Sequence, residues 1–311
     1  MAKIVIIGNT SHCNQLANQL DPYFDTVRTI RPADFKLYEI RKLLSNIRII
    51  KNSDVVYGIF SAYHLSYWIV ARLFSKKTIN HWIGTDVYVL FKKGIKYDFV
   101  NILSKFAQKL ITTNVIGSEF LKEELNKKNI DGLVIPLIAE GINLDSQAPP
   151  EEHAVLTYIP NGREEFYNLD MVINLASEFT DVNFIVVGND GKNVQDRQLF
   201  KNISFKGYVS KQEMDEIYSK VSILIRLPIH DGFSMMVIEA MAKGKTVIYR
   251  MNQEGTIHIG EYEELRKVFK ETIKSKPTVN HEAVDYVKGN LNKKTIVEQI
   301  RDVILTQIIS G

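Results

Sequence analysis

The sequence predicts an α/β fold of two doubly wound domains, each built on a parallel sheet, that face each other across a cleft. Short, apolar, β-rich runs alternate with stretches of helical periodicity throughout the 311 residues, which is the pattern of parallel strands joined by crossover helices. A polar, proline-bearing stretch over residues 141–153 interrupts this alternation, which then restarts. The length and the 45% share of hydrophobic residues suffice for two cores of ordinary size.

The first domain is expected to span residues 1–148. Its predicted strands are, in order, Lys3–Gly8, Asp54–Phe60, Lys77–Trp82, Leu110–Asn114 and Gly132–Pro136. Helices are expected to fill the gaps between them. The clearest covers Gly117–Lys128, where Phe120, Leu121 and Leu125 fall on one face and Ser118 is the expected N-cap.

The second domain is expected to span residues 149–292. Its predicted strands are Ala154–Ile159, Val182–Gly188, Ile203–Lys206, Val221–Arg226 and Lys245–Arg250. Helices are predicted to begin near Leu169 and Gln212 and to cover Ser234–Lys243. Residues 293–311 carry an apolar stripe at helical spacing over Lys293–Ile309. This helix is expected to pack against one of the domains, with the N-terminal domain as the candidate.

Composition and charge narrow the class of protein. Cys13 is the only cysteine, which excludes a disulfide framework and favours a reducing compartment, the cytoplasm. No apolar run reaches the roughly 18 residues of a membrane span. Residues 1–150 carry 19 Lys and Arg against 13 Asp and Glu, whereas residues 151–311 carry 20 against 23. This excess predicts that the first domain faces something anionic, either lipid headgroups at the inner face of the membrane or a phosphorylated acceptor. Nucleic acid is disfavoured because there is no arginine-rich run.

The segment that says most about function is His-Asp-Gly-Phe-Ser-Met-Met-Val-Ile-Glu-Ala-Met-Ala-Lys-Gly over residues 230–244. It resembles the signature of the retaining GT-B glycosyltransferases of glycosyltransferase family 4. In that signature an acid precedes Gly-Phe-Gly, and a second acid follows eight positions later in Glu-Ala-Met-Ala-x-Gly. The two acids here are Asp231 and Glu239. The resemblance covers most of residues 153–250 well and the first half more loosely. It implies a GT-B fold in which the first domain binds the acceptor and the second domain binds the nucleotide sugar.

The resemblance also implies a role for each residue of this segment. Asp231 would contact hydroxyls of the transferred sugar, and Glu239 would bind the ribose of the donor nucleotide. The backbone N–H groups of Gly232, Phe233 and Ser234 can donate to sugar hydroxyls or to a phosphate at the start of the following helix. The alternative is that Asp231 is a turn residue and Glu239 a solvated helix residue. Aspartate in place of the usual glutamate shortens the reach by one methylene, which leaves the sugar open.

Two arginines are candidates for the donor diphosphate. Arg226 ends an apolar strand, and the carboxyl ends of parallel strands are where ligands bind. It either faces the diphosphate or forms a structural ion pair, with Asp231 as a candidate partner. Gly162 and Arg163 resemble the Gly-Arg loop that cradles donor phosphates in the family. The Lys-Gly that usually follows this loop is replaced by Tyr167-Asn168, and the alternative for Arg163 is an exposed loop arginine.

The first domain contributes two further candidates to the catalytic set. The segment from Asn80 to Asp86 resembles the family's turn on the acceptor side of the cleft. By this resemblance His81 would orient the donor sugar and Asp86 would engage the acceptor hydroxyl, with a structural histidine as the alternative for His81. The first loop, Gly8, Asn9 and Thr10, is expected to line the cleft. It lacks the Gly-x-Gly-x-x-Gly spacing of a dinucleotide site, which argues against a dehydrogenase.

The implied activity is retaining transfer of a sugar from a nucleoside diphosphate sugar to a hydroxyl of a saccharide, glycolipid or protein, in the assembly of bacterial-type surface polysaccharide, glycolipid or glycoprotein. No cofactor and no metal are expected, since the sequence has no Asp-x-Asp. Two alternatives stay open: an inactive glycosyltransferase-like subunit, suggested by the missing lysine, and a GT-B sugar epimerase. The basic, aromatic stretch Phe91–Lys109 either lies on an anionic bilayer or packs as an ordinary core-facing helix.

Overall fold

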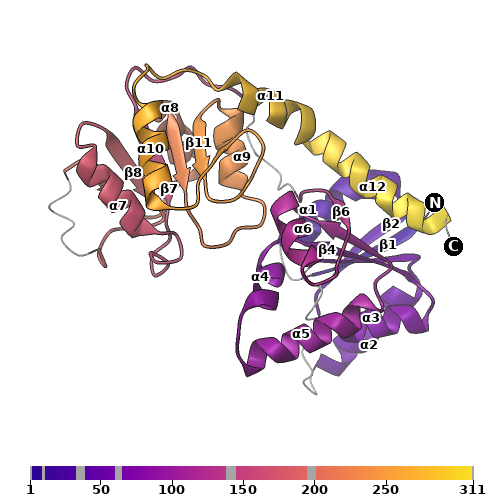
Figure 1. Cartoon of the computed structure of the whole chain (residues 1–311). Coiled ribbons are helices and arrows are strands. Elements are labelled where there is room, and N and C mark those ends of the chain that lie inside the picture. Colours follow the sequence, from indigo (N-terminus) through magenta and orange to yellow (C-terminus); the bar gives the residue numbers. More distant parts are fainter. Residues whose placement is uncertain are drawn as a thin grey trace. The chain divides into compact units, whose positions relative to one another are not determined.

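A computed structural model describes residues 2–8, 11–32, 39–59, 65–137, 145–194 and 201–309. The chain forms two compact units, Met1–Gly141 with Asn292–Gly311, and Ile142–Leu291. Each unit is built on one six-stranded sheet in which every pairing is parallel (Figure 1). The predicted α/β class with two parallel sheets is therefore confirmed. The expected boundary after residue 148 lies a few residues beyond the observed division. None of the helices in these residue ranges is long and apolar enough to cross a bilayer.

The sheet of the first unit has the strand order β2-β1-β3-β4-β5-β6. Its strands are β1 (Lys3–Ile7), β2 (Thr26–Ile30), β3 (Val55–Ile59), β4 (Lys77–Trp82), β5 (Thr113–Ile116) and β6 (Leu133–Val134). All five residues of β3 are buried because helices cover both faces of the sheet. The prediction missed β2 and placed the fourth strand too early. Leu110 and Ile111 instead follow the end of a helix and pack against the core from outside the sheet.

Helices of the first unit cover the two faces of this sheet. They are α1 (Ser11–Leu20), η1 (Asp21–Tyr23), α2 (Ile40–Lys51), α3 (Leu65–Leu73), α4 (Thr85–Phe91), α5 (Ile95–Gln108), α6 (Glu119–Asn126) and α12 (Lys293–Ile309). The helices α2, α3 and α5 lie side by side on one face, and Trp68 of α3 is fully buried there (Figure 1). A Cβ at Gly58 would clash with the Trp68 ring, so β3 needs glycine at this point. The helix α12 contacts α1, β3 and β4.

The predicted N-cap of α6 is confirmed, because Ser118 Oγ accepts a hydrogen bond from Leu121 N (3.3 Å). In α12 the predicted stripe forms a buried face that includes Ile296, Ile300 and Ile304. The apolar stripe therefore predicts the buried side of this helix correctly.

The sheet of the second unit has the strand order β12-β11-β10-β7-β8-β9. Its strands are β7 (Ala154–Tyr158), β8 (Asn183–Val187), β9 (Ile203–Phe205), β10 (Ile223–Arg226), β11 (Thr246–Tyr249) and β12 (Ile257–His258). Its helices are α7 (Leu169–Glu178), α8 (Lys211–Lys220), α9 (Met235–Ala242), α10 (Tyr262–Thr272) and α11 (His281–Asn290). The chain builds outward in both directions from the neighbouring strands β7 and β10. Such a topological switch point is where open α/β sheets bind ligands, beyond the carboxyl ends of the strands.

Candidate functional site

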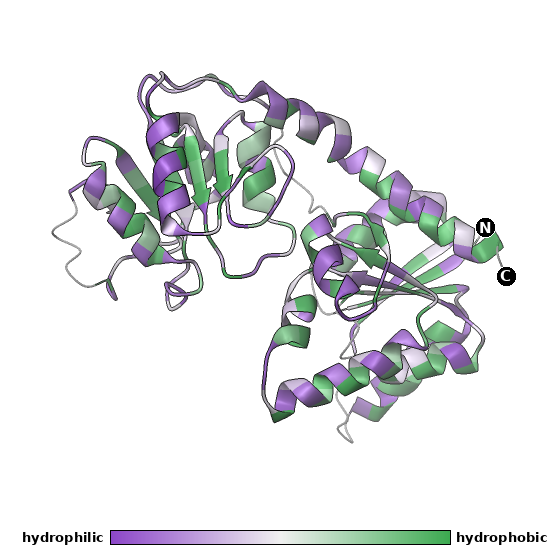
Figure 2. Ribbon diagram, viewed as in Figure 1, coloured by the Kyte–Doolittle hydropathy of each residue, from purple (hydrophilic) through white to green (hydrophobic). Residues whose placement is uncertain are grey.

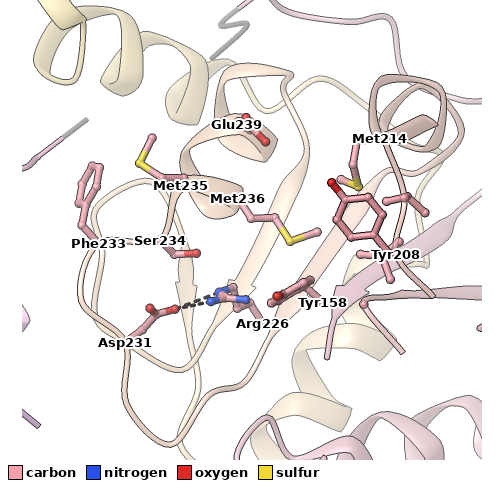
Figure 3. Close-up of a pocket in the computed structure, with 13 residues that line it drawn as sticks. Tyr158, Tyr208, Met214, Arg226, Asp231, Phe233, Ser234, Met235, Met236 and Glu239 are labelled. Carbon is pink, nitrogen blue, oxygen red and sulfur yellow. Dashed lines mark hydrogen bonds and ion pairs between the residues drawn. The ribbon is translucent and has the colours of Figure 1, made fainter. Parts of the chain in front are cut away.

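A pocket of about 510 Å³ opens at this switch point in the second unit (Figure 3). Tyr158, Val187 and Arg226, the last residues of β7, β8 and β10, line it. The remaining lining comes from Gly188 after β8, from the segment before and within α8, and from the turn before α9 and the first part of α9 itself. The parallel sheet therefore brings the ends of three strands and the start of one helix to a single hollow. This is the location that the sequence predicts for the donor.

At the floor of the pocket Arg226 forms an ion pair with Asp231. Oδ2 of Asp231 accepts from Nε (2.9 Å) and Nη2 (2.8 Å) of Arg226, which is only 7% exposed. Burial opposes the charge of the guanidinium, but Asp231 and nearby tyrosines outweigh it and hold the pKa of Arg226 above its usual value. The third nitrogen, Nη1, is buried and has no hydrogen-bond partner within the described ranges. Since buried polar groups are seldom left unpaired, this nitrogen is available to a ligand.

Arg226 lies next to Tyr167, the residue that replaces the expected lysine. The guanidinium of Arg226 lies 5.2 Å from the ring centre of Tyr167 and 5.6 Å from that of Tyr158. Tyr167 stands where the resemblance leads one to expect a phosphate-binding lysine. Arg226 therefore supplies a cation from β10 directly beside the position at which the lysine is absent.

The start of α9 faces the same pocket. Ser234 is its N-cap, but no hydrogen bond from the helix reaches the serine side chain. Ser234 Oγ is buried and unpartnered as far as the described residues go. The first N–H groups of a helix have no partner within it and carry a partial positive charge. Together with Arg226 Nη1, they make this end of the pocket suited to an anion or to sugar hydroxyls.

Glu239 lines the pocket from farther along α9 (Figure 3). Its Oε2 accepts a hydrogen bond from Tyr218 Oη (3.2 Å). Burial raises the pKa of Glu239, whereas the Tyr218 hydrogen bond and the charge of Lys243 act in the opposite direction. Glu239 therefore presents a hydrogen-bond acceptor at the pocket wall.

Tyr208 and Met214 lie on the opposite side of the pocket from Asp231 and Phe233 (Figure 3). The ring of Tyr208 is 94% exposed. Neither residue was assigned a role from the sequence, although Gly207-Tyr208-Val209 comes just after β9 and so shares the carboxyl edge of the sheet. The pocket has an apolar end and a charged end.

Three of the predicted donor-binding residues, Gly162, Arg163 and Gly232, do not line the pocket. Gly162 has a φ of +75°, which glycine adopts without strain, but its N–H donates to Glu164 Oε1 (3.1 Å). Arg163 is exposed, stacks on Phe166 with 4.2 Å to the ring centre, and does not line the pocket. Gly232 lies in the turn after Asp231, and its N–H donates to Asp231 Oδ1 (3.1 Å). The second unit thus brings Arg226, Asp231, Phe233, Ser234 and Glu239 together and leaves Arg163 outside.

The surroundings of His81 do not fit the expectation that it orients the donor sugar. The residue is fully buried in β4. Its Nε2–H donates to the carbonyl of Ile135 (3.0 Å), and its Nδ1 accepts from the hydroxyl of Tyr57 (2.8 Å). Burial lowers the pKa of His81 to about 4, so the ring is neutral near pH 7. Both nitrogens are engaged inside the first unit, and His81 has a structural role.

Asp86 is also fully buried, in the turn that begins α4. Its Oδ1 accepts from the N–H groups of Ile83 (3.2 Å), Gly84 (2.9 Å) and Val87 (3.1 Å). Burial raises the pKa of Asp86 to about 6, although these hydrogen bonds oppose the shift. Its Oδ2 is buried, with no hydrogen-bond partner in the part of the chain that is described. The role of Asp86 toward an acceptor stays a prediction.

We expect Asp86→Asn to remove a pH dependence of stability. A carboxyl whose folded-state pKa is raised to about 6, from an ordinary value near 3.9, stabilises the fold below about pH 4. That contribution is lost as the pH rises to 6. Between pH 4.5 and 7.5 the wild type should lose about 2 kcal/mol of unfolding free energy relative to the variant. Thermal or urea unfolding at the two pH values measures this, and a constant difference between the proteins would contradict it.

The first loop is placed only at Gly8. A Cβ there would clash with Cys13 Sγ, so glycine is required for α1 to pack this close to β1. Asn9 and Thr10 lie outside the described residues. Within those residues no three His, Cys, Asp or Glu side chains are grouped so that they could hold a metal ion.

The second unit matches a known protein family, and the whole chain is similar to several solved structures. Residues 142–272, most of the second unit, match the family model described as glycosyl transferases group 1. The whole chain is similar to HepE from Anabaena in complex with UDP and glucose, at 13% identity and a TM-score of 0.74, over 98% of this chain and 100% of that one. It is also similar to sucrose-phosphate synthase from Thermosynechococcus elongatus, at 12% identity and a TM-score of 0.76, over 100% of both chains.

A third similar structure is the lipopolysaccharide outer core galactosyltransferase WaaB, at 14% identity and a TM-score of 0.72, over 98% of this chain and 99% of that one. No curated protein sequence matches the chain significantly. At such identities the likeness establishes the fold, which is GT-B. Together with the match of the second unit, it supports a glycosyltransferase.

Proposed function

We propose that this chain, whose second unit matches the group 1 glycosyltransferases, transfers a sugar from a nucleoside diphosphate sugar to a hydroxyl acceptor with retention at the anomeric carbon. The observation that carries the proposal is the pocket at the switch point of the second unit. It holds two carboxylates, the helix N-terminus and a buried guanidinium with one unpaired nitrogen.

The two ends of the pocket suggest how the donor binds. Tyr208 and Met214 offer an apolar surface for the base, and Glu239 is the acceptor for the ribose hydroxyls. Arg226 Nη1 and the first N–H groups of α9 bind the diphosphate. The sugar then lies toward Asp231 and Phe233, where Asp231 accepts hydrogen bonds from its hydroxyls. UDP is the first nucleotide to test, because HepE is described in complex with UDP-glucose.

In this arrangement catalysis rests on position and on charge. As the bond between sugar and diphosphate breaks, negative charge grows on the leaving phosphate, and Arg226 and the helix N-terminus stabilise it. Retention then follows from attack by the acceptor hydroxyl on the face that the diphosphate leaves. The acceptor oxygen forms the new bond to the anomeric carbon and the departing phosphate oxygen takes the hydroxyl proton, so the protein supplies no dedicated nucleophile. Basic and dipolar groups supply the charge compensation that a divalent ion provides in other transferases, so the proposed reaction uses no metal. The proposed acceptor is a saccharide, a glycolipid or a protein in surface-glycan assembly.

A nucleotide screen followed by a turnover assay tests the proposal. Thermal shift with UDP, GDP, ADP and CMP should give a clear rise with one nucleotide, since a ligand at 100 times its Kd adds about 2.7 kcal/mol. The matching nucleotide sugar should then release free nucleoside diphosphate when an acceptor is present, in EDTA as well as with magnesium. Nucleotide binding without turnover of any donor would instead identify an inactive subunit. Conversion of the donor sugar without an acceptor would identify an epimerase.

A further inference from the structure

The outer side of α5 carries an exposed apolar stripe. Ile95, Phe99, Ile102 and Phe106 are spaced four, three and four residues apart and so lie in one row along the helix. Their exposed fractions are 91%, 60%, 51% and 53%. The inner side of the same helix, with Val100, Ser104 and Ala107, is buried against the first unit. The exposed stripe is therefore separate from the buried side of α5, which holds the helix in the fold.

The neighbouring helices continue this surface. On α3, Ile69 (44% exposed) and Leu73 (76%) are one turn apart, and on α2, Ile40 (53%) and Leu44 (61%) are one turn apart. Because α2 contacts α3 and α3 contacts α5, the three sets belong to one layer. We call this surface the α2–α3–α5 layer. Figure 2 shows hydrophobic residues mixed with hydrophilic ones along these helices.

The charged residues of the layer are almost all basic. The helices α2, α3 and α5 contain seven Lys and Arg and one acid, Asp98. All seven basic residues are exposed: Arg41, Lys42, Arg48, Lys51, Arg72, Lys96 and Lys105. On α5, Lys96 and Lys105 fall on opposite sides of the apolar stripe at 100° per residue. The excess of positive charge in the first half of the sequence is thus concentrated on the surface that exposes apolar side chains.

We propose that the α2–α3–α5 layer binds the interface of an anionic lipid bilayer. Apolar side chains on a basic helical surface bind such membranes by inserting between headgroups while the cations stay at the phosphate level. Lysine and arginine suit this arrangement because their long stems are apolar and their heads reach the phosphates. The proposal does not depend on the reaction that the second unit catalyses.

The charge of the layer argues against a second copy of the chain as its partner. A two-fold symmetric interface places the same surface on both sides. Seven cations and one acid on each side would then face the same set, and like charges at an interface oppose association. An anionic bilayer fits both the apolar side chains and the cations of the layer, because its interior accepts the former and its headgroups neutralise the latter.

Sedimentation with vesicles tests the proposal on the whole chain. Vesicles of phosphatidylglycerol mixed with phosphatidylcholine should bind the protein. Vesicles of phosphatidylcholine alone should bind it at least tenfold more weakly, because each cation near an anionic surface contributes about fivefold. Binding should weaken from low salt to about 0.15 M salt, where the Debye length is about 8 Å. Failure to bind the anionic vesicles at low salt would overturn the proposal.

Two double variants locate the contact. Lys96→Glu with Lys105→Glu should weaken binding by roughly 25-fold or more, since each cation contributes about fivefold. The matched control reverses the charges of Lys267 and Lys270, on α10 in the second unit, and its binding should stay within about twofold of the wild type.

The second double variant removes apolar side chains. Ile95→Ser with Phe99→Ser should weaken binding by about tenfold or more at both salt concentrations. Its control is Leu305→Ser with Ile309→Ser, an exposed apolar pair one turn apart on α12.

Nucleotide binding by each variant provides the check that the fold is intact, because none of the eight positions lines the pocket. Equal loss of vesicle binding in the variants and their controls would show that the layer is not the contact. A wild type that sediments as a dimer, and becomes a monomer in Ile95→Ser with Phe99→Ser, would assign the surface to a second copy and overturn the proposal.

Discussion

Replacing Arg226 by alanine is expected to weaken the binding of free nucleoside diphosphate by about 10- to 100-fold and to lower turnover by at least as much. The reason is that the unpaired Nη1 of Arg226 is a buried cationic donor in the pocket, beside the position where the usual lysine is replaced by Tyr167. A hydrogen bond from a charged group contributes roughly 1.5 to 3 kcal/mol. Calorimetry with the nucleotide and a turnover assay with the full donor measure the two losses.

The competing interpretation is that Arg226 serves only as the partner of Asp231, at 2.8 Å. A double-variant cycle separates the two roles. If Arg226 binds the diphosphate, its removal should weaken nucleotide binding by the same factor in the wild type and in Asp231→Asn. If it serves only the ion pair, Arg226→Ala should lower thermal stability, because an uncompensated charge is left in the pocket. Nucleotide affinity would then stay at the wild-type value, which would contradict the phosphate role.

The second large effect distinguishes the roles of Asp231 and Glu239, which the proposal assigns to opposite ends of the donor. Asp231→Asn should lower turnover by about 10- to 100-fold, because a charge-assisted hydrogen bond to the transferred sugar is lost. Free nucleoside diphosphate should bind no more weakly than before, since the neutral amide in this variant no longer holds Arg226 by charge. Glu239→Gln should weaken nucleotide binding and raise KM with a smaller effect on kcat, because the ribose contact is made in the ground state and in the transition state alike.

Calorimetry with the nucleotide alone, set beside steady-state kinetics with the donor, resolves this pair of variants. Tyr218→Phe is a useful companion, because it removes the hydrogen bond to Glu239 (3.2 Å) but leaves the carboxylate in place. Loss of nucleotide binding in Asp231→Asn with normal binding in Glu239→Gln would show that the donor lies in the pocket the other way round.

The pocket proposed for the donor gathers residues that the sequence singled out, because most of these are close together along the chain. Arg226, Asp231 and Glu239 all lie between the end of β10 and the middle of α9, so one strand, one turn and one helix fix their relative positions. The ion pair between Arg226 and Asp231 was anticipated as an alternative for the same reason. The apolar end was missed, because Tyr208 and Met214 reach the pocket only through the order of the strands in the sheet.

His81 shows what the sequence could not reveal. Burial keeps its ring neutral, and its hydrogen bonds go to Tyr57 and to the carbonyl of Ile135, which are distant in the sequence. Tyr57 reaches His81 when β3 pairs with β4, and Ile135 reaches it because the chain after β6 lies beside β5. The missed strand β2 has a related cause. Its five residues, Thr26–Ile30, include Arg28, and only Ile30 is buried, so an edge strand of this kind shows neither a continuous apolar run nor alternation.

The assignment of α12 to the first unit has a consequence for proteolysis. The chain passes between the units twice, once after Gly141 and once after Leu291. A single cleavage after residue 141 would leave two fragments that remain associated, because α12 belongs to the second fragment but packs on α1, β3 and β4 of the first. Ile300 and Ile304 are buried in that packing. Only a further cleavage after residue 291 would release residues 142–291 as one continuous piece.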